Sequence, residues 1–167
     1  MRRSSEENKE VLILDTAGLF AIQSLTSSQE IYTVPEAIEE VVDEESRDKL
    51  GLVIASGRIR ITQPSQENIR YIKEIAKEIG VEEALSDTDT KILALAYQLQ
   101  RNGYKTTIVS DDSFIHRVAR ILGIGSVSIK YRMSGRSRLR YYICPVCGYR
   151  SLKRFDICPI CRTKIKR

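Results

Sequence analysis

Four cysteines near the end of the chain have the spacing of a metal site. Two C-x-x-C pairs are separated by ten residues: Cys144 with Cys147, and Cys158 with Cys161. Each pair can wrap half of one tetrahedral ion, so the spacing predicts a single structural zinc site; two disulfides or free thiols are the alternatives. Gly148 permits a backbone turn after the first pair, whereas Arg162 stands at the matching place after the second.

Four acidic residues are candidates for hydrolytic chemistry: Asp15, Glu40, Asp89 and Asp112. Clustered carboxylates raise one another's pKa unless a cation lies among them. Hard cations such as Mg²⁺ or Mn²⁺ prefer oxygen ligands, activate water and stabilise charge on an attacked phosphodiester. Taken together, the four acids predict a metal-dependent phosphodiesterase site.

Taken singly, these acids have ordinary explanations. Asp89 lies in the first turn of a predicted helix, where the helix dipole favours negative charge. Asp112 is placed to cap the helix that begins at Ser113, and Asp111 competes with it as a ligand. By sequence alone, three acidic neighbours would serve as well as Glu40: Glu36, Glu39 and Asp43. Asp15 differs, because a charge that ends an apolar strand is seldom without a role.

Strands alternate with helices through the first 130 residues, which predicts an α/β fold with a parallel sheet and helices on both faces. The expected strands are 11–14, 58–62, 106–109 and 126–129, and the first reads as a buried central strand. Ligands bind beyond the carboxyl ends of such strands. We therefore expect Asp15 and the Asp111–Asp112 pair at one edge of the sheet.

The expected helices are 17–25, 36–49, a segment opened by Pro64 and Ser65 and stopped at Gly80, 86–103 and 113–122. An inward stripe of the second helix is predicted from Ile38, Val41 and Val42. The helix after Ser86 is apolar around most of its circumference. It should be deeply buried and should bring Asp89 toward the same sheet edge.

Charge divides the chain into two modules. Residues 131–167 hold 11 Lys and Arg against one Asp, a net charge of +10, and residues 1–130 hold 16 against 21, a net charge of −5. Cations interleaved with aromatic rings are typical of single-stranded nucleic-acid binding, although a solubilising surface is the alternative. The predicted RNA contacts are Arg138, Arg140, Tyr142, Arg150, Lys153 and Arg154.

Other classes are disfavoured. The sequence has no run of 18 apolar residues and no signal-peptide pattern, so we expect a soluble, cytoplasmic protein. Neither a G-x-x-x-x-G-K-[ST] loop nor a G-x-G-x-x-G fingerprint occurs, which argues against P-loop and dinucleotide chemistry. His116 is the only histidine, and without a nucleophile partner it is expected to fill the surface or core.

Several segments in combination resemble a PIN-domain ribonuclease. They are 12–16 (LILDT), 32–33 with Glu40, 85–89 (LSDTD), 93–96 (LALA) and 109–112 (VSDD). With the C-terminal cysteines, the chain is similar to the archaeal and eukaryal Nob-family endonucleases, which mature the 3′ end of small-subunit ribosomal RNA. The resemblance covers residues 11–161.

The resemblance implies a metal-dependent endoribonuclease that cleaves single-stranded precursor 16S rRNA during ribosome biogenesis. It implies Mg or Mn ligands at Asp15, Glu40, Asp89 and Asp112. It ranks Asp112 before Asp111, because the family places the acid two residues after Ser or Thr, here Ser110. The implied domains are a flexible N-terminus (1–10), a PIN-like nuclease domain (11–130), a basic linker (131–140) and a zinc ribbon (141–167).

Two rival functions remain. A non-catalytic RNA-binding assembly factor would need the basic module and its zinc but not Asp15. A different carboxylate phosphotransferase or a Toprim-type enzyme is weakened by the first strand, since Asp15-Thr16-Ala17 lacks the second acid of a D-x-D motif.

Overall fold

A computed structural model describes residues 9–21, 29–129, 142–147, 150–151, 156–158 and 160–164. The chain divides into two compact units, residues 1–133 and 134–167, and each has its own sheet. The predicted linker 131–140 and nearly all of the predicted flexible N-terminus lie outside the described residues.

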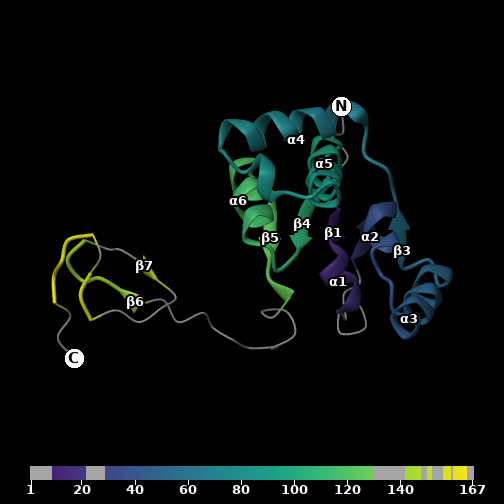
Figure 1. Ribbon diagram of the computed structural model, residues 1–167, viewed down its shortest axis with the longest axis horizontal. Helices are drawn as coiled ribbons and strands as arrows, with labels where there is room; N and C mark the ends of the chain where they lie inside the picture. The colour runs from purple at the N-terminus through teal and green to yellow at the C-terminus, as the bar shows by residue number, and fades with distance from the viewer. Residues whose placement is uncertain are drawn as a thin grey trace, which may run out of the picture. The chain divides into compact units, whose positions relative to one another are not determined.

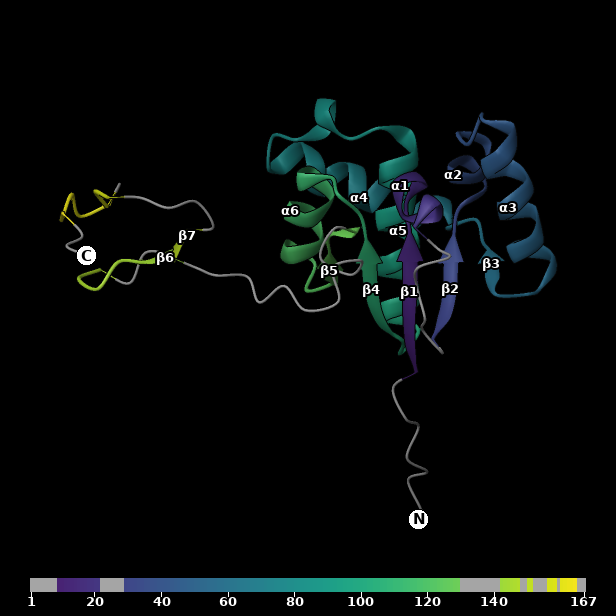
Figure 2. The same cartoon turned by 90° about the horizontal axis from the view of Figure 1, so that it is seen from below.

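The first unit is built on a five-stranded parallel sheet in the order β3-β2-β1-β4-β5 (Figures 1 and 2). The strands are β1 (Glu10–Leu14), β2 (Glu30–Thr33), β3 (Ile59–Ile61), β4 (Lys105–Val109) and β5 (Gly125–Val127). The central strand β1 pairs with β2 on one side and β4 on the other. Its residues 11–14 are fully buried, as expected for an uninterrupted apolar strand covered on both faces.

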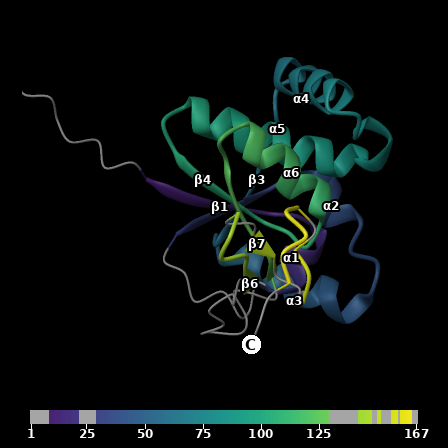
Figure 3. The same cartoon turned by 90° about the vertical axis from the view of Figure 1, so that its left-hand side faces the viewer.

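Helices cover both faces of this sheet, which confirms the predicted fold class. They are α1 (Thr16–Phe20), α2 (Pro35–Glu39), α3 (Glu44–Ala55), α4 (Gln66–Glu78), α5 (Asp87–Arg101) and α6 (Ser113–Ile121), with a 3₁₀ turn at Glu82–Ala84. Figure 3 shows α4, α5 and α6 on one side of the sheet and α1 and α3 on the other. The apolar helix α5 buries eight residues, as its sequence predicts.

Three predictions about the first half of the chain were wrong. Strand β2 was missed because Glu30–Thr33 is only four residues long and lies just before the helix-starting Pro35. The expected helix 36–49 is two helices, since Asp43 caps a new one by accepting a hydrogen bond from Ser46 N (3.1 Å). This break leaves Val42 81% exposed, whereas Val41 is buried.

The strand order places a topological switch between β1 and β4. The chain steps from β1 to β2 and β3, then returns to start β4 on the other side of β1. In open parallel sheets, the crevice beyond the carboxyl ends of two such strands is the usual ligand site. Asp15 directly follows β1, and residues 110–112 directly follow β4.

The second unit contains a two-stranded antiparallel sheet, β6 (Tyr142–Ile143) and β7 (Arg150–Ser151), and an isolated bridge between Ile157 and Lys164. Within the described ranges, no helix is long and apolar enough to cross a membrane.

Candidate active site and cysteine centre

Asp15 is a nearly buried carboxylate between the ends of two strands. It is 7% exposed, and its Oδ1 accepts a hydrogen bond from Gly18 N (2.6 Å) that caps α1. Burial raises the pKa of Asp15, whereas hydrogen bonds from Ser110 and Gly18 act in the opposite direction. The negative charges of Asp89 and Asp111 raise this pKa further.

Gly18 allows α1 to pack closely against β4. A Cβ atom at this position would lie 2.9 Å from the Val109 carbonyl oxygen and 3.2 Å from Asp15 Oδ1. A side chain there would displace either the strand end or the carboxylate. The glycine therefore fixes where Asp15 stands relative to β4.

The loop after β4 carries two acids with different partners. Asp112 caps α6, because its Oδ1 accepts from Phe114 N (2.6 Å) and Ile115 N (3.2 Å). Asp111 Oδ1 instead accepts from the Ser128 hydroxyl (2.5 Å) and Ile129 N (3.0 Å) after β5. Of the two, it is Asp111 whose charge raises the pKa of Asp15. Asp111 and Asp112 therefore both remain candidates for the fourth metal ligand.

His116 ties this loop to β5. A backbone carbonyl only accepts, so Nε2 donates to the Ser110 carbonyl oxygen (2.9 Å), and Nδ1 accepts from the Ser126 hydroxyl (2.8 Å). The Ser110 hydroxyl in turn accepts from Asp112 N (3.0 Å) and bonds the Asp15 carboxylate. The ring therefore braces the residue that links Asp15 to the acidic loop.

Asp89 lies at the start of α5 in a capping box. Ser86 Oγ accepts from Asp89 N (3.0 Å), and Asp89 Oδ2 accepts from the Ser86 N–H (3.0 Å) and hydroxyl (2.7 Å). The structure thus confirms that Asp89 lies in the first turn of α5, as the sequence predicts. In the described part of the chain, Oδ2 makes both of these cap bonds, which leaves Oδ1 for other contacts.

Glu40 bridges the segments that carry Asp15 and Asp89. Its Oε2 accepts from the Thr16 hydroxyl and its Oε1 from the Thr88 hydroxyl, both at 2.5 Å. Its acidic neighbours are placed differently: Glu36 pairs with Lys91, Asp43 caps α3, and Glu39 is exposed. Thr16 and Thr88 each adjoin a candidate acid, so Glu40 joins the same edge from the side of α2.

The acids gather at one edge but do not form a closed cage. In the described part of the chain, no three acidic side chains bring one oxygen each to within 4.8 Å of one another. Oxygen-rich side chains around a buried carboxylate of raised pKa nevertheless fit a hard divalent cation, which would offset the burial and repulsion at Asp15.

The four cysteines do converge. Their sulfur atoms lie within 4.8 Å of one another, with 3.6 Å between Cys144 and Cys161 and 3.5 Å between Cys147 and Cys158. Tetrahedral Zn–S bonds of about 2.3 Å place sulfurs ~3.8 Å apart, so this set fits zinc. Hydrogen bonds from Thr163 lower the pKa of Cys161 to about 6, which favours the ligating thiolate.

The turn after the second pair has an unusual backbone. Arg162 has φ +55°, in the left-handed region that favours glycine, and its N–H donates to the Cys158 carbonyl (2.9 Å). Cys158 N in turn donates to the Thr163 carbonyl (3.0 Å). The site thus imposes a glycine-like turn on an arginine.

The predicted RNA contacts are only partly visible. Arg138, Arg140, Lys153 and Arg154 lie outside the described residues, and for Tyr142 and Arg150 only the backbone in β6 and β7 is described. Sequence reasoning gave no role to Thr16, Thr88, Gly18 or His116. Thr16 and Thr88 each stand next to a candidate acid, a signal available in the sequence; nothing there marks the partners of His116.

Comparison with known proteins gives one family and several relatives. A family described as the PIN domain of ribonuclease matches residues 12–99. The chain is 38% identical to a protein named Endoribonuclease Nob1 from Pyrococcus abyssi, over 82% of this chain and 79% of that protein. It is 34% identical to one named Ribonuclease VapC3 from Aeropyrum pernix, over 77% of this chain and 92% of that protein.

A eukaryotic relative matches over a smaller share. A protein from Schizosaccharomyces pombe named 20S-pre-rRNA D-site endonuclease nob1 is 38% identical over 53% of this chain but only 23% of its own length.

Proposed function

The chain belongs to the PIN-domain ribonucleases, and from that premise we propose that it is a metal-dependent endoribonuclease that cleaves single-stranded precursor rRNA at the 3′ end of 16S rRNA. The observation that carries the proposal is the carboxyl edge of the sheet. There Asp15 is buried between β1 and β4, and Glu40 is bonded to the threonines that adjoin Asp15 and Asp89. The rRNA substrate is supported by the names of the relatives.

We assign the catalytic edge to Asp15, Glu40, Asp89 and either Asp112 or Asp111. A divalent cation bound there, Mg²⁺ or Mn²⁺, would supply an activated water and stabilise charge on the attacked phosphate. The chain's own part is to hold carboxylate oxygens in place: Gly18 N and Ser110 fix Asp15, and Thr16 and Thr88 fix Glu40. Because bare carboxylates repel phosphate, RNA binding needs cations elsewhere.

We assign that role to the basic residues of the second unit, folded around one structural zinc. If about five phosphates are contacted, log affinity should fall with log salt at a slope near −3.5, taking ~0.7 per contact for single strands. A slope near zero would show that the basic module is not the RNA-binding element.

The decisive experiment uses an RNA that spans the 3′ end of small-subunit rRNA, with wild type and Asp15→Asn, in Mn²⁺ or EDTA. Asparagine keeps an oxygen that accepts from Gly18 N, so the fold should survive while cleavage is lost and RNA binding stays. Cleavage by the variant, or by wild type in EDTA, would sink the mechanism. Retained rRNA maturation by Asp15→Asn would favour the assembly-factor alternative.

Matched pairs of variants identify the remaining ligands. Glu40→Gln should abolish cleavage, whereas Glu39→Gln, an exposed neighbour, should leave it unchanged. Asp112→Asn keeps an oxygen for the α6 cap, and Asp111→Asn keeps one for Ser128 and Ile129 N. Whichever of the two variants raises the Mn²⁺ concentration needed for half-maximal cleavage marks the ligand.

A further inference from the structure

A mostly buried cation stands beside the acidic edge. Lys91 follows Asp89 by two residues in α5, and its side chain is only 16% exposed. Its Nζ donates to Glu36 Oε1 in α2 (2.9 Å) and lies 2.6 Å from Asp87 Oδ2 in its own helix. The ammonium group therefore links α5, which carries Asp89, to α2, which ends at Glu40.

The contact with Glu36 lies one helical turn from the contact that holds Glu40. On α5, Lys91 comes three residues after Thr88, whose hydroxyl donates to Glu40 Oε1. On α2, the two acids share one turn, since Glu40 N donates to the Glu36 carbonyl oxygen (3.1 Å). Residues three or four apart lie on the same face of a helix, so the two contacts set the register of α2 against α5. The position of Glu40 thus depends on where Glu36 is held.

Glu36 depends on this cation because part of its carboxylate is shielded from water. Its Oε2 is buried and, within the described residues, makes no hydrogen bond, while its Oε1 also accepts from Gln63 Nε2 (3.2 Å). A buried carboxylate that loses its cationic partner is strongly destabilised, so without Lys91 it would have to turn toward solvent. Because Glu36 and Glu40 share one turn, that movement would draw Glu40 away from Thr88.

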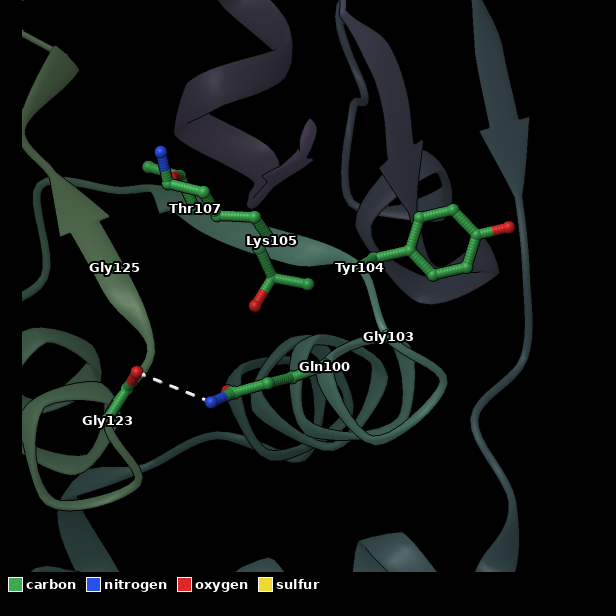
Figure 4. A pocket seen from close by; sticks show the side chains of 8 residues that line it. Gln100, Gly103, Tyr104, Lys105, Thr107, Gly123 and Gly125 are labelled. Atoms are coloured by element: carbon green, nitrogen blue, oxygen red, sulfur yellow. Dashed lines mark hydrogen bonds between the residues drawn. The ribbon is translucent and has the colours of Figure 1, made fainter. Parts of the chain in front are cut away.

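A second ion pair of the same unit is an ordinary surface pair. Lys105, which lines a pocket of about 400 Å³ at the amino edge of the sheet, pairs through Nζ with Glu10 (Figure 4). The two side chains are 65% and 45% exposed, and such pairs contribute little to stability. Strand β4 runs from Lys105 to Val109 beside the acidic loop, which at ~3.3 Å per residue is about 13 Å. This pair is therefore a control for the loss of an ion pair away from the acids.

We propose that Lys91 is a positioning residue for the metal site: by neutralising Glu36, it holds α2 against α5 so that Glu40 stays beside Asp89. The inference rests on the proposed function, because it takes Glu40 and Asp89 as ligands of the divalent cation. It also gives the two acids of α2 different tasks. A carboxylate that already holds an ammonium group attracts a second cation less, which leaves Glu40 as the ligand.

The test is binding of Mn²⁺ to the full chain without RNA, measured by titration calorimetry. Asp15→Asn, which removes a central acid, identifies the heat that belongs to the acidic edge. Lys91→Met should raise the Mn²⁺ dissociation constant about tenfold, as loss of a residue that orients a metal ligand does. Lys73→Met removes an exposed cation 3.8 Å from Asp87, and Lys105→Met removes the surface pair. Neither control should change the dissociation constant.

The direction of the change separates positioning from charge. Loss of a positive charge near the site should by itself tighten Mn²⁺, because like charges repel. Weaker binding therefore reports a displaced ligand, and tighter binding by Lys91→Met would overturn the proposal. A lower melting temperature with unchanged Mn²⁺ affinity would also overturn it, since the pair would then serve stability alone.

A double variant tests the route through Glu36. Replacing both partners of a buried ion pair by apolar side chains is often neutral, whereas removing one partner is not. Lys91→Met combined with Glu36→Leu should therefore recover the Mn²⁺ affinity of the wild type. A double variant that binds as weakly as Lys91→Met would contradict the assignment. If the wild type binds no Mn²⁺ at the acidic edge, the proposed metal site fails and this inference with it, whereas unaltered binding by Lys91→Met sinks this inference alone.

Discussion

The two units of this protein place their functional groups by opposite means. In the described part of the first, thirty buried apolar residues form one core, and Asp15 stands at its edge. In the second, Cys144 and Cys158 are buried, while the apolar side chains of Val146, Ile157 and Ile160 are more than half exposed. Among the described residues of the second unit, one cysteine of each pair is buried while these aliphatic side chains face solvent, the reverse of the first unit.

This contrast indicates what holds each part together. Positions of the acids follow from packing and hydrogen bonds that form without any ion, such as those from Gly18, Thr16 and Thr88. A short segment with exposed aliphatic residues has too little core to fold alone, so we expect its folding to depend on a metal held by the four cysteines. Removing metal should therefore abolish structure in one unit and only chemistry in the other.

The largest effect should come from Cys158→Ser. Zinc contributes about 10 kcal/mol or more of folding free energy to small structural sites, so loss of one thiolate should unfold residues 134–167. Metal content and trypsin cleavage of this unit report the loss, while the melting transition of the first unit should stay unchanged. Ile160→Ser, at an exposed position between the second pair of cysteines, is the control and should retain zinc. If both units instead unfold in one shared melting transition, they do not fold independently, one through its core and the other through its metal.

The reverse experiment perturbs the core. Leu93 is fully buried in α5, and Leu93→Ala should lower the free energy of unfolding by about 3 kcal/mol through lost burial and a cavity. Zinc content should not change. Leu52→Ala, at a position 74% exposed, should change the free energy of unfolding by less than ~0.5 kcal/mol, as judged by urea unfolding.

In both units, the features that could be predicted from the sequence are those that depend mainly on neighbouring residues in the chain. The apolar run of β1, the Ser86 cap of α5 and the paired cysteines are decided by neighbours in the chain, and they were predicted. The predictions failed at β2, which is only four residues long, and at Val42, where Asp43 caps a second helix that was not expected. Spacing alone could not separate Glu40 from its neighbours, because its threonine partners lie 24 and 48 residues away.

The hydrogen-bond partners of His116 could not be predicted from the sequence either. Substitution of this residue should have a smaller effect than the two changes above. We predict that it is a positioning residue that acts through Ser110, since its ring bonds Ser110 and Ser126 rather than either candidate acid. His116→Phe keeps a ring but removes both hydrogen bonds, and should lower kcat about tenfold, equivalent to ~1.4 kcal/mol, with KM for RNA unchanged. The Mn²⁺ concentration for half-maximal cleavage should rise. His116→Gln, which keeps an N–H donor, should be milder. A loss of stability alone, with unaltered metal dependence, would make the ring a packing residue.

The smallest effect concerns the turn that the second unit imposes on Arg162. A non-glycine residue at φ +55° costs about 1 kcal/mol, and we expect the proposed zinc-bound form to carry this cost. Arg162→Gly should therefore hold zinc about fivefold more tightly against a competing chelator. Arg162→Ala removes the same charge but keeps Cβ, so it should show no such gain. If glycine and alanine tighten zinc equally, the effect belongs to the lost charge. If only glycine does, the cysteine centre is strong enough to strain its own backbone, whereas the acids of the first unit take their positions from a packed core.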